Sequence, residues 1–220
     1  MSYLFSGTFS FSSPLLVEFS FSQVLILFLS TEFPSWTFSH EDTLSYVSYD
    51  VGDSQGTDFK VSFFLRSLKQ GGLILQLAHP GQDDPYFLLF LKAGRLMVHS
   101  HPDASPLIAP VFLTNGEKQL VEVELTDGLV FFEYGGLRYS LGAFPEAEVE
   151  AGDSAYVGGL PEGELEEWGG HFKGCLQDFR LGDVHLDLDA WNSSVDTTVY
   201  YPNDSENVER DCLSDDTCTV

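Results

Sequence analysis

The chain has 220 residues and a formal net charge of −24, from 34 acidic and 10 basic side chains. Such a charge repels phosphate backbones and anionic lipid surfaces, which argues against nucleic acid as a partner. Hydrophobic residues make up 43% of the sequence, which excludes a disordered chain and predicts one globular domain.

The first 35 residues differ in composition from the rest. They contain no lysine or arginine and are rich in serine, phenylalanine and leucine. Their apolar run at 24–29 is too short to span a bilayer, and no basic region precedes it as in a signal peptide. We therefore expect residues 1–35 to lie outside the fold, and we prefer a start displaced from the true one as the explanation.

From Trp36 onward, short segments alternate apolar and polar side chains, as β-strands do. Two-residue turns such as Asp127-Gly128 and Gly135-Gly136 join several of them as hairpins. No window has the apolar spacing of an amphipathic helix over three turns. The predicted fold class is all-β, an antiparallel sandwich of two packed sheets. The predicted strands are 59–66, 73–77, 86–92, 95–99, 121–125, 129–134 and 137–141.

The three cysteines, Cys175, Cys212 and Cys218, make an odd number. We predict a disulfide between Cys175 and Cys212, which closes a loop of roughly 40 residues and stabilises the fold by about 4 kcal/mol in the chain-entropy model. Cys218 is then left over, and residues 213–220 are expected to begin another cysteine-containing module. The alternative, a reactive nucleophile, lacks an electropositive neighbour in the sequence.

Two triplets fit the acceptor pattern for N-glycosylation. They begin at Asn192 and Asn203, which we predict to carry sugars. Together with the predicted disulfide and the acidic surface, they favour a secretory route and an extracellular location.

Three segments carry motifs of a known family. They are F-F-L-R at 63–66 with G-L-I-L at 72–75, Y-F-L-L-F-L-K-A-G-R-L at 86–96, and Y-V-G-G-L-P at 156–161 followed by F-K-G-C-L-Q-D-F-R at 172–180. These motifs resemble laminin G-like domains, and the last is most similar to ectodomain modules of the Crumbs polarity family. The resemblance covers residues 36–212. It implies a concanavalin-like jelly roll, followed at 213–220 by the start of a truncated EGF-like module.

The resemblance also implies a cation site at the rim of the sandwich. Its carboxylates would be Asp84 or Asp83, before the 86–92 strand, and Asp153 before the strand at Tyr156. Calcium-binding members usually place the aspartate directly before the tyrosine, whereas Pro85 intervenes here. Ca²⁺ needs six or more oxygen ligands and the proline disfavours the site, so we expect a cation-free solvated surface and no cofactor. Ca²⁺ is kept as the one alternative.

The sequence contains only weak candidates for catalytic groups. The acidic runs at 146–150 and 162–166 place carboxylates at alternate positions, as glycosidases do, but neither has an aromatic platform for a sugar. His99 and His101 with Asp103 lack a third histidine or cysteine nearby, so exposed imidazoles are the expectation there. We predict no catalytic residue.

Tryptophans raise two alternatives. Trp168 follows Glu166-Glu167 in an acidic loop, where an indole suits either a protein contact or packing against the sandwich. Trp36 and Trp191 raise the same question. We expect binding to use loops at one end of the sandwich, where Asp83, Asp84, Asp153 and Trp168 would gather.

The predicted function is a non-enzymatic recognition and spacer module of a multi-domain ectodomain. The Crumbs resemblance implies that the parent protein acts in cell adhesion or apical polarity and that it reaches the apical plasma membrane through an anchor outside this chain. The expected partner is an extracellular protein, a glycan or a second copy of the chain. The alternative is a calcium-dependent module of a secreted matrix protein that binds a glycan or a receptor.

Overall fold

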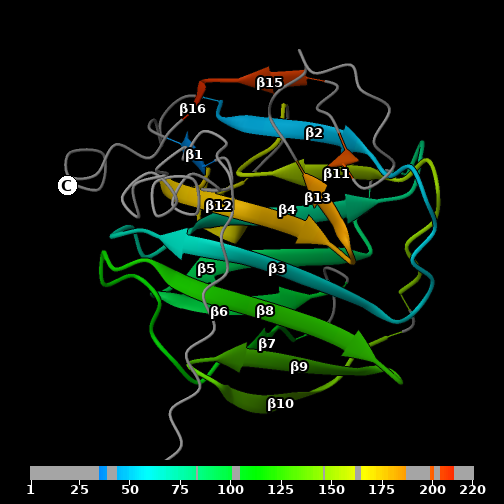
Figure 1. The fold of residues 1–220 in the computed structure, drawn as a ribbon, viewed down its shortest axis with the longest axis horizontal. Helices are drawn as coiled ribbons and strands as arrows, with labels where there is room; N and C mark the ends of the chain where they lie inside the picture. The colour runs from blue at the N-terminus through cyan, green and yellow to red at the C-terminus, as the bar shows by residue number, and fades with distance from the viewer. Residues whose placement is uncertain are drawn as a thin grey trace, which may run out of the picture. The chain divides into compact units, whose positions relative to one another are not determined.

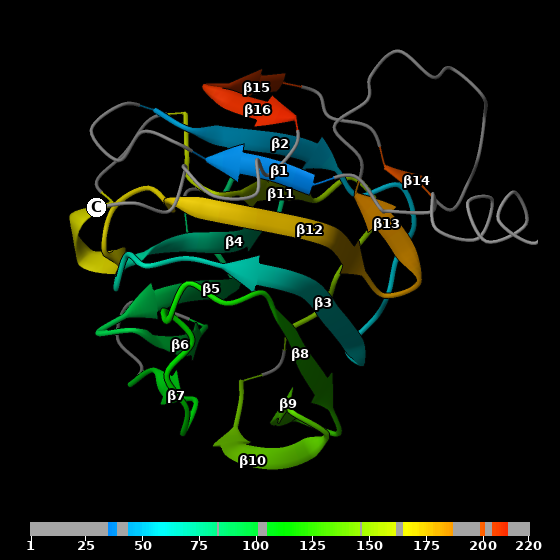
Figure 2. The same ribbon diagram turned by 60° about the vertical axis from the view of Figure 1, so that its left-hand side comes forward.

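The computed structural model describes residues 35–38, 44–82, 84–100, 105–145, 147–161, 165–186, 199–200 and 204–210. In these ranges the chain forms two β-sheets whose inner faces pack together (Figure 1 and Figure 2). The predicted all-β sandwich is confirmed. The one helix among the described residues is a single 3-10 turn, η1 (Glu166–Trp168).

One sheet has nine strands. β13 (Val184–Leu186) pairs with β12, and β14 (Val199–Tyr200) adds to β13 in parallel. Every other pairing in this sheet is antiparallel. The remaining strands lie in the order β10 (Leu137–Ala143), β9 (Leu129–Tyr134), β8 (Gln119–Thr126), β3 (Phe59–Arg66), β12 (Gly174–Leu181), β1 (Ser35–Phe38) and β16 (Val208–Arg210).

The other sheet has seven strands, all antiparallel to their neighbours. Their order is β15 (Asp204–Glu206), β2 (Tyr46–Asp50), β11 (Ser154–Val157), β4 (Gly72–Ala78), β5 (Phe87–Lys92), β6 (Arg95–His99) and β7 (Leu107–Ile108).

Alternation along the strands builds the core. In β3 each odd-numbered residue from Phe59 to Leu65 is buried and each intervening residue is half-buried on the outer face. Phe59 meets Phe87 of the opposite sheet edge to face, with ring centroids 5.1 Å apart. Every residue of β4 is buried, because a second apolar cluster covers its outer side as well. That outer cluster consists of Leu73, Leu88, Phe90 and Leu165, with Trp168 packed against it.

Tight turns set the hairpins. Asp127 and Gly128 have φ of 51° and 69°, and Gly135 and Gly136 have 58° and 76°. Two left-handed residues in a two-residue loop match the twist of the flanking strands, so the predicted hairpins β8–β9 and β9–β10 form.

The ends of the described chain lie next to each other. Trp36 of β1 is opposite Leu176 of β12 on one side and Arg210 of β16 on the other. Residues 1–34 and 211–220 lie outside the described residues, so the predicted boundaries at 35 and 213 stay predictions. No helix in the described part of the chain is long and apolar enough to cross a membrane.

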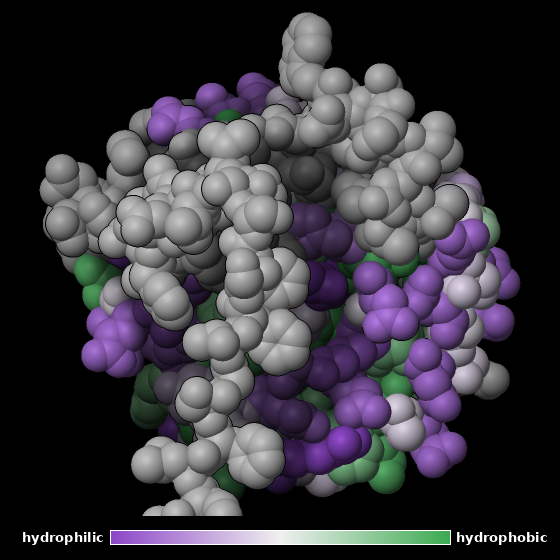
Figure 3. Space-filling view, in the orientation of Figure 1, coloured by the Kyte–Doolittle hydropathy of each residue, from purple (hydrophilic) through white to green (hydrophobic). Residues whose placement is uncertain are grey.

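Space-filling atoms show how polar residues cover the sandwich. In the described part of the visible face, hydrophilic side chains predominate and apolar ones appear as small separate areas (Figure 3). This surface agrees with the large excess of acidic residues in the sequence.

Candidate functional site

Three strand ends meet around Asp153. The residue directly precedes β11, and the register of β11 with β4 places Ser154 opposite Ala78. His79, the next residue after Ala78, therefore lies beside Asp153. Tyr86 joins them from the start of β5, because its backbone N–H donates to Leu77 of β4 at 3.1 Å. We call His79, Tyr86, Glu150 and Asp153 the rim cluster.

The carboxylate of Asp153 accepts three contacts although it is 0% exposed. The Tyr86 hydroxyl donates to Oδ2 at 2.8 Å, and the backbone N–H of Glu150 donates to the same oxygen at 2.8 Å. Nδ1 of His79 lies 2.8 Å from Oδ1. Because a buried charge is costly unless hydrogen-bonded, these partners account for an aspartate in the interior.

Tyr86 is held in its donating state. Burial, and then the hydrogen bond to Asp153, raise the pKa of the Tyr86 hydroxyl above its ordinary value. Its ring also stacks on the His79 ring, with centroids 4.5 Å apart and planes inclined by 26°. The hydroxyl therefore keeps its proton throughout the physiological pH range.

The three predicted cation ligands differ in position and burial. Asp83 lies outside the described residues, Asp84 is exposed, and Asp153 is buried in the rim cluster. Ligand atoms of His79, Glu150 and Asp153 lie within 4.8 Å of one another. Calcium takes six to eight oxygens, whereas this set offers two carboxylates and an imidazole, and both oxygens of Asp153 already have protein partners. The described side chains of the rim cluster therefore do not complete a calcium site by themselves, and calcium binding stays a prediction.

Sequence reasoning found Asp153 but missed its partners. His79 is 74 residues from Asp153 and Tyr86 is 67 residues away. Only the β4–β11 register brings His79 and Tyr86 to Asp153, and no local sequence pattern predicts that register. The prediction that Asp153 binds a cation stays a prediction.

Trp168 does not join the rim cluster. Its ring lies 5.1 Å from Phe90 and 5.2 Å from His99, whereas Asp153 contacts Tyr86, which lies four residues before Phe90 and directly precedes β5. At the rise of a strand, four residues span about 13 Å. The expectation that His99 is exposed is wrong: the side chain is 4% exposed and lies against Trp168.

The structure describes only one of the two cysteines in the predicted disulfide. Cys175 lies buried on β12, is disulfide-bonded, and has its Sγ 3.7 Å from Oγ1 of Thr37. The pairing with Cys212 stays a prediction, because Cys212 lies outside the described residues. Asn192, Asn203 and Cys218 lie outside them too.

The remaining candidates are dispersed. Trp36 is a core residue, and Trp191 lies outside the described residues. The acidic runs are described only in part, at Glu148, Glu150 and Glu166, which are all exposed.

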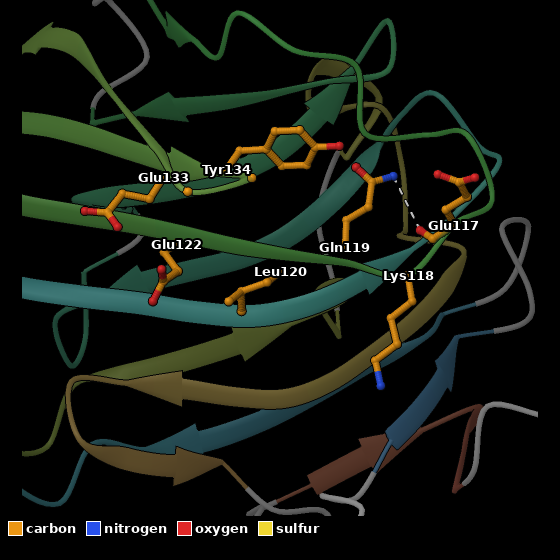
Figure 4. A pocket seen from close by; sticks show the side chains of 9 residues that line it. Glu117, Lys118, Gln119, Leu120, Glu122, Glu133 and Tyr134 are labelled. Carbon is orange, nitrogen blue, oxygen red and sulfur yellow. Dashed lines mark hydrogen bonds between the residues drawn. The ribbon is translucent and has the colours of Figure 1, made fainter.

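A shallow pocket of about 390 Å³ lies beside the β9–β10 turn (Figure 4). Glu122 of β8 and Glu133 of β9 are directly opposite each other in its wall. Lys60 pairs with Glu122 at 2.5 Å and Arg138 with Glu133 at 3.5 Å. Since each carboxylate has a basic partner, the opposed pair forms part of an ion-pair network.

Comparison with known proteins finds a matching family model and two similar relatives. Residues 65–184 match the family model of the laminin G domain. The chain is 27% identical over 190 residues to protein crumbs homolog 1 of Mus musculus, and 30% identical over 192 residues to protein crumbs homolog 2 of Homo sapiens. These matches cover 85% and 86% of the chain but only 13% of each relative.

A solved structure supports the same fold. Domains LG4-5 of the mouse laminin alpha1 chain match with a TM-score of 0.64 and 21% identity, over 80% of this chain and 46% of that one.

Proposed function

This chain belongs to the laminin G domain family, and from that premise we propose that it is a non-enzymatic extracellular recognition module. The similarity to two crumbs homologues over 85% and 86% of the chain supports a role within a larger ectodomain. In its finer form, the proposal places the parent protein at the apical plasma membrane, in adhesion or epithelial polarity.

The observation that carries the proposal is the way Asp153 fixes the rim loops. One carboxylate ties together the segments at His79, Tyr86 and Glu150, so the loops between these strands lie on a rigid support. The same loops expose the side chains of Asp84 and Glu150. A fixed loop end with free carboxylates suits a partner with a basic surface.

The net charge of the chain distinguishes between two classes of partner, proteins and anionic glycans. A chain of charge −24 repels sulfated or otherwise anionic glycans at long range, and attracts proteins that present lysine and arginine. We therefore favour an extracellular protein over an anionic glycan as the partner.

Staining of epithelial cells with a fluorescent tetramer of the full chain tests this function. We expect the double variant Asp84→Ala/Glu150→Ala to lower apparent affinity at least tenfold. The control, Glu166→Ala/Glu167→Ala, removes the same charge from exposed positions in η1, beyond the other end of β5. Absent staining, or equal losses in both variants, would contradict the proposal.

The calcium-dependent alternative rests on the three ligand atoms within 4.8 Å in the rim cluster. Against it, both Asp153 oxygens already accept contacts from protein groups. Calorimetric titration of the chain with calcium chloride decides between the two. We expect no heat of binding and no change in melting temperature, whereas saturable heat that Asp84→Asn removes would favour the alternative.

An extracellular route also predicts covalent features that lie outside the described residues. We expect a Cys175–Cys212 bridge and sugars on Asn192 and Asn203. Peptide mapping by mass spectrometry, with and without reductant, reports all of them. A free Cys212 in protein secreted from cells would refute the pairing.

A further inference from the structure

One strand at a sheet end is longer and less protected against pairing than the others. β10 has seven residues, ends the nine-stranded sheet and, within the described part of the chain, pairs only with β9. The other strands at sheet ends have two or three residues. β7 lies between Pro106 and Pro110, and β15 carries Asp204 and Glu206, which are devices that discourage pairing. β10 has no proline and no acidic residue, and its one irregularity is a bulge between Ser140 and Gly142, beyond its first four residues.

Arg138, the single charged residue of β10, does not block pairing at the free edge of the strand. The guanidinium of Arg138 contacts Glu124 of β8 at 3.0 Å and Glu133 of β9 at 3.5 Å, and its Cζ lies 4.2 Å from the centre of the Phe131 ring. All three partners lie on strands inside the sheet. The arginine therefore extends over the sheet face, away from the edge where a further strand would pair.

The free edge offers both backbone and apolar groups. Gly135-Gly136 is a two-residue loop, so Tyr134 and Leu137 exchange hydrogen bonds, and Arg138 and Ser140 turn their N–H and C=O groups toward the edge. Leu137 is 60% exposed, while Tyr139 and Leu141 pack only partly against the core.

We propose that β10 pairs antiparallel with β10 of a second copy of this chain, about a two-fold axis at Tyr139. This register places Tyr139 opposite its counterpart and Arg138 opposite Ser140, and it brings Leu137 to Leu141, the residue at the bulge. Apolar side chains then meet on the core side, the outward-turned backbone groups of Arg138 and Ser140 pair, and no like charges oppose. An isologous contact of this kind joins the two nine-stranded sheets.

Charge distinguishes a second copy from a foreign strand. Two chains of charge −24 repel at long range, while the contact itself contains no acidic residue. Salt screens that repulsion, so self-association is expected to strengthen as ionic strength rises. A basic peptide on the same edge would bind more weakly as salt increases.

Sedimentation velocity of the full chain at 50 and 500 mM NaCl tests the proposal. We expect a concentration-dependent dimer that is favoured at the higher salt. Leu137→Lys should weaken it at least tenfold. Leu120→Lys, at a leucine 44% exposed on the sheet face, is the matched control and should not. A monomer at every salt and concentration, or equal weakening by both variants, overturns the proposal.

Cross-linking tests the register and does not depend on Leu137→Lys folding. Under mild oxidation Tyr139→Cys should form a disulfide-linked dimer, because its counterpart lies directly opposite. Ser140→Cys should not, because its counterpart is two residues further along and more than about 7 Å away between Cα atoms. The reverse pattern would refute this register. Both experiments use the chain alone, so they are independent of the proposed partner recognition.

Discussion

The two ends of β5 are held in place by different interactions. At its start, Tyr86 donates to a fully buried carboxylate that also binds two other segments. At its end, Phe90 packs under Trp168 of η1 in the outer apolar cluster. Hydrogen bonds to a buried charge are lost all at once when a partner is removed, whereas apolar burial declines with the area removed. At the rim end, stability should therefore depend on single hydrogen-bonding atoms. At the Trp168 end, it should depend on the volume of the side chain.

The largest effect is expected from Asp153→Ala. Removing the carboxylate leaves the Tyr86 hydroxyl, the Glu150 N–H and the His79 ring without their acceptor, so the free energy of unfolding should fall by about 3 kcal/mol. Urea denaturation measures it. Asp84→Ala, an exposed acid of the same rim, should stay within about 0.5 kcal/mol of the parent. Equal losses would show that the hydrogen bonds of Asp153 are not the cause.

Trp168→Ala should cost about 2 kcal/mol. A fully buried tryptophan would lose more, but Trp168 is half-buried on Phe90 and His99. Trp168→Phe keeps most of the ring contact and should cost about half as much. Scanning calorimetry compares the two. Similar losses would contradict the dependence on volume.

Tyr86→Phe removes one oxygen from the rim and should cost about 1.5 kcal/mol, as expected for a hydrogen bond to a charged group. A double-mutant cycle checks the cause. In an Asp153→Ala background the same change should cost less than about 0.5 kcal/mol, since the bond is already absent. An additive result would assign the loss to ring packing.

The smallest expected effect is on the pH dependence of stability, and it comes from His171. This residue forms an isolated parallel β-bridge with Leu73 of the outer cluster, near Trp168. Burial lowers the pKa of the His171 imidazole below its ordinary value, so the folded state favours the neutral ring. The unfolded state then binds more protons near pH 6, and the free energy of unfolding falls as pH decreases from 7.5 to 5.5. His171→Gln should reduce that fall, and an unchanged pH dependence would contradict it.

Local patterns predicted most of the fold. The predicted strands from 59–66 to 137–141 form within about two residues of their expected bounds, because alternation and two-residue turns are local signals. β1 and β2 went unassigned. Their partners are distant in sequence, as with Thr37 opposite Cys175 and Tyr46 opposite Glu206, and each strand alone is too short for a pattern.

The candidate site was less predictable. Asp153 stands out in sequence as an acid before a strand, but its role depends on His79 and Tyr86, which arrive through sheet register. His99 was expected to be exposed because it ends a strand. A residue 69 positions later, Trp168, covers it, and nothing near His99 in the sequence signals that cover.

The position of β1 between β12 and β16 has a mechanical consequence. Since Trp36 and Arg210 are opposite each other on antiparallel neighbours, the polypeptide entering β1 and the polypeptide leaving β16 emerge side by side. When the Cys175 disulfide is reduced, tension applied through these two connections loads the β1–β16 ladder from its open end and separates its backbone hydrogen bonds one after another. Stretching the reduced chain by optical tweezers should therefore detach β16 at low force, whereas a closed Cys175–Cys212 bridge should carry the load to β12 and keep β16 in place.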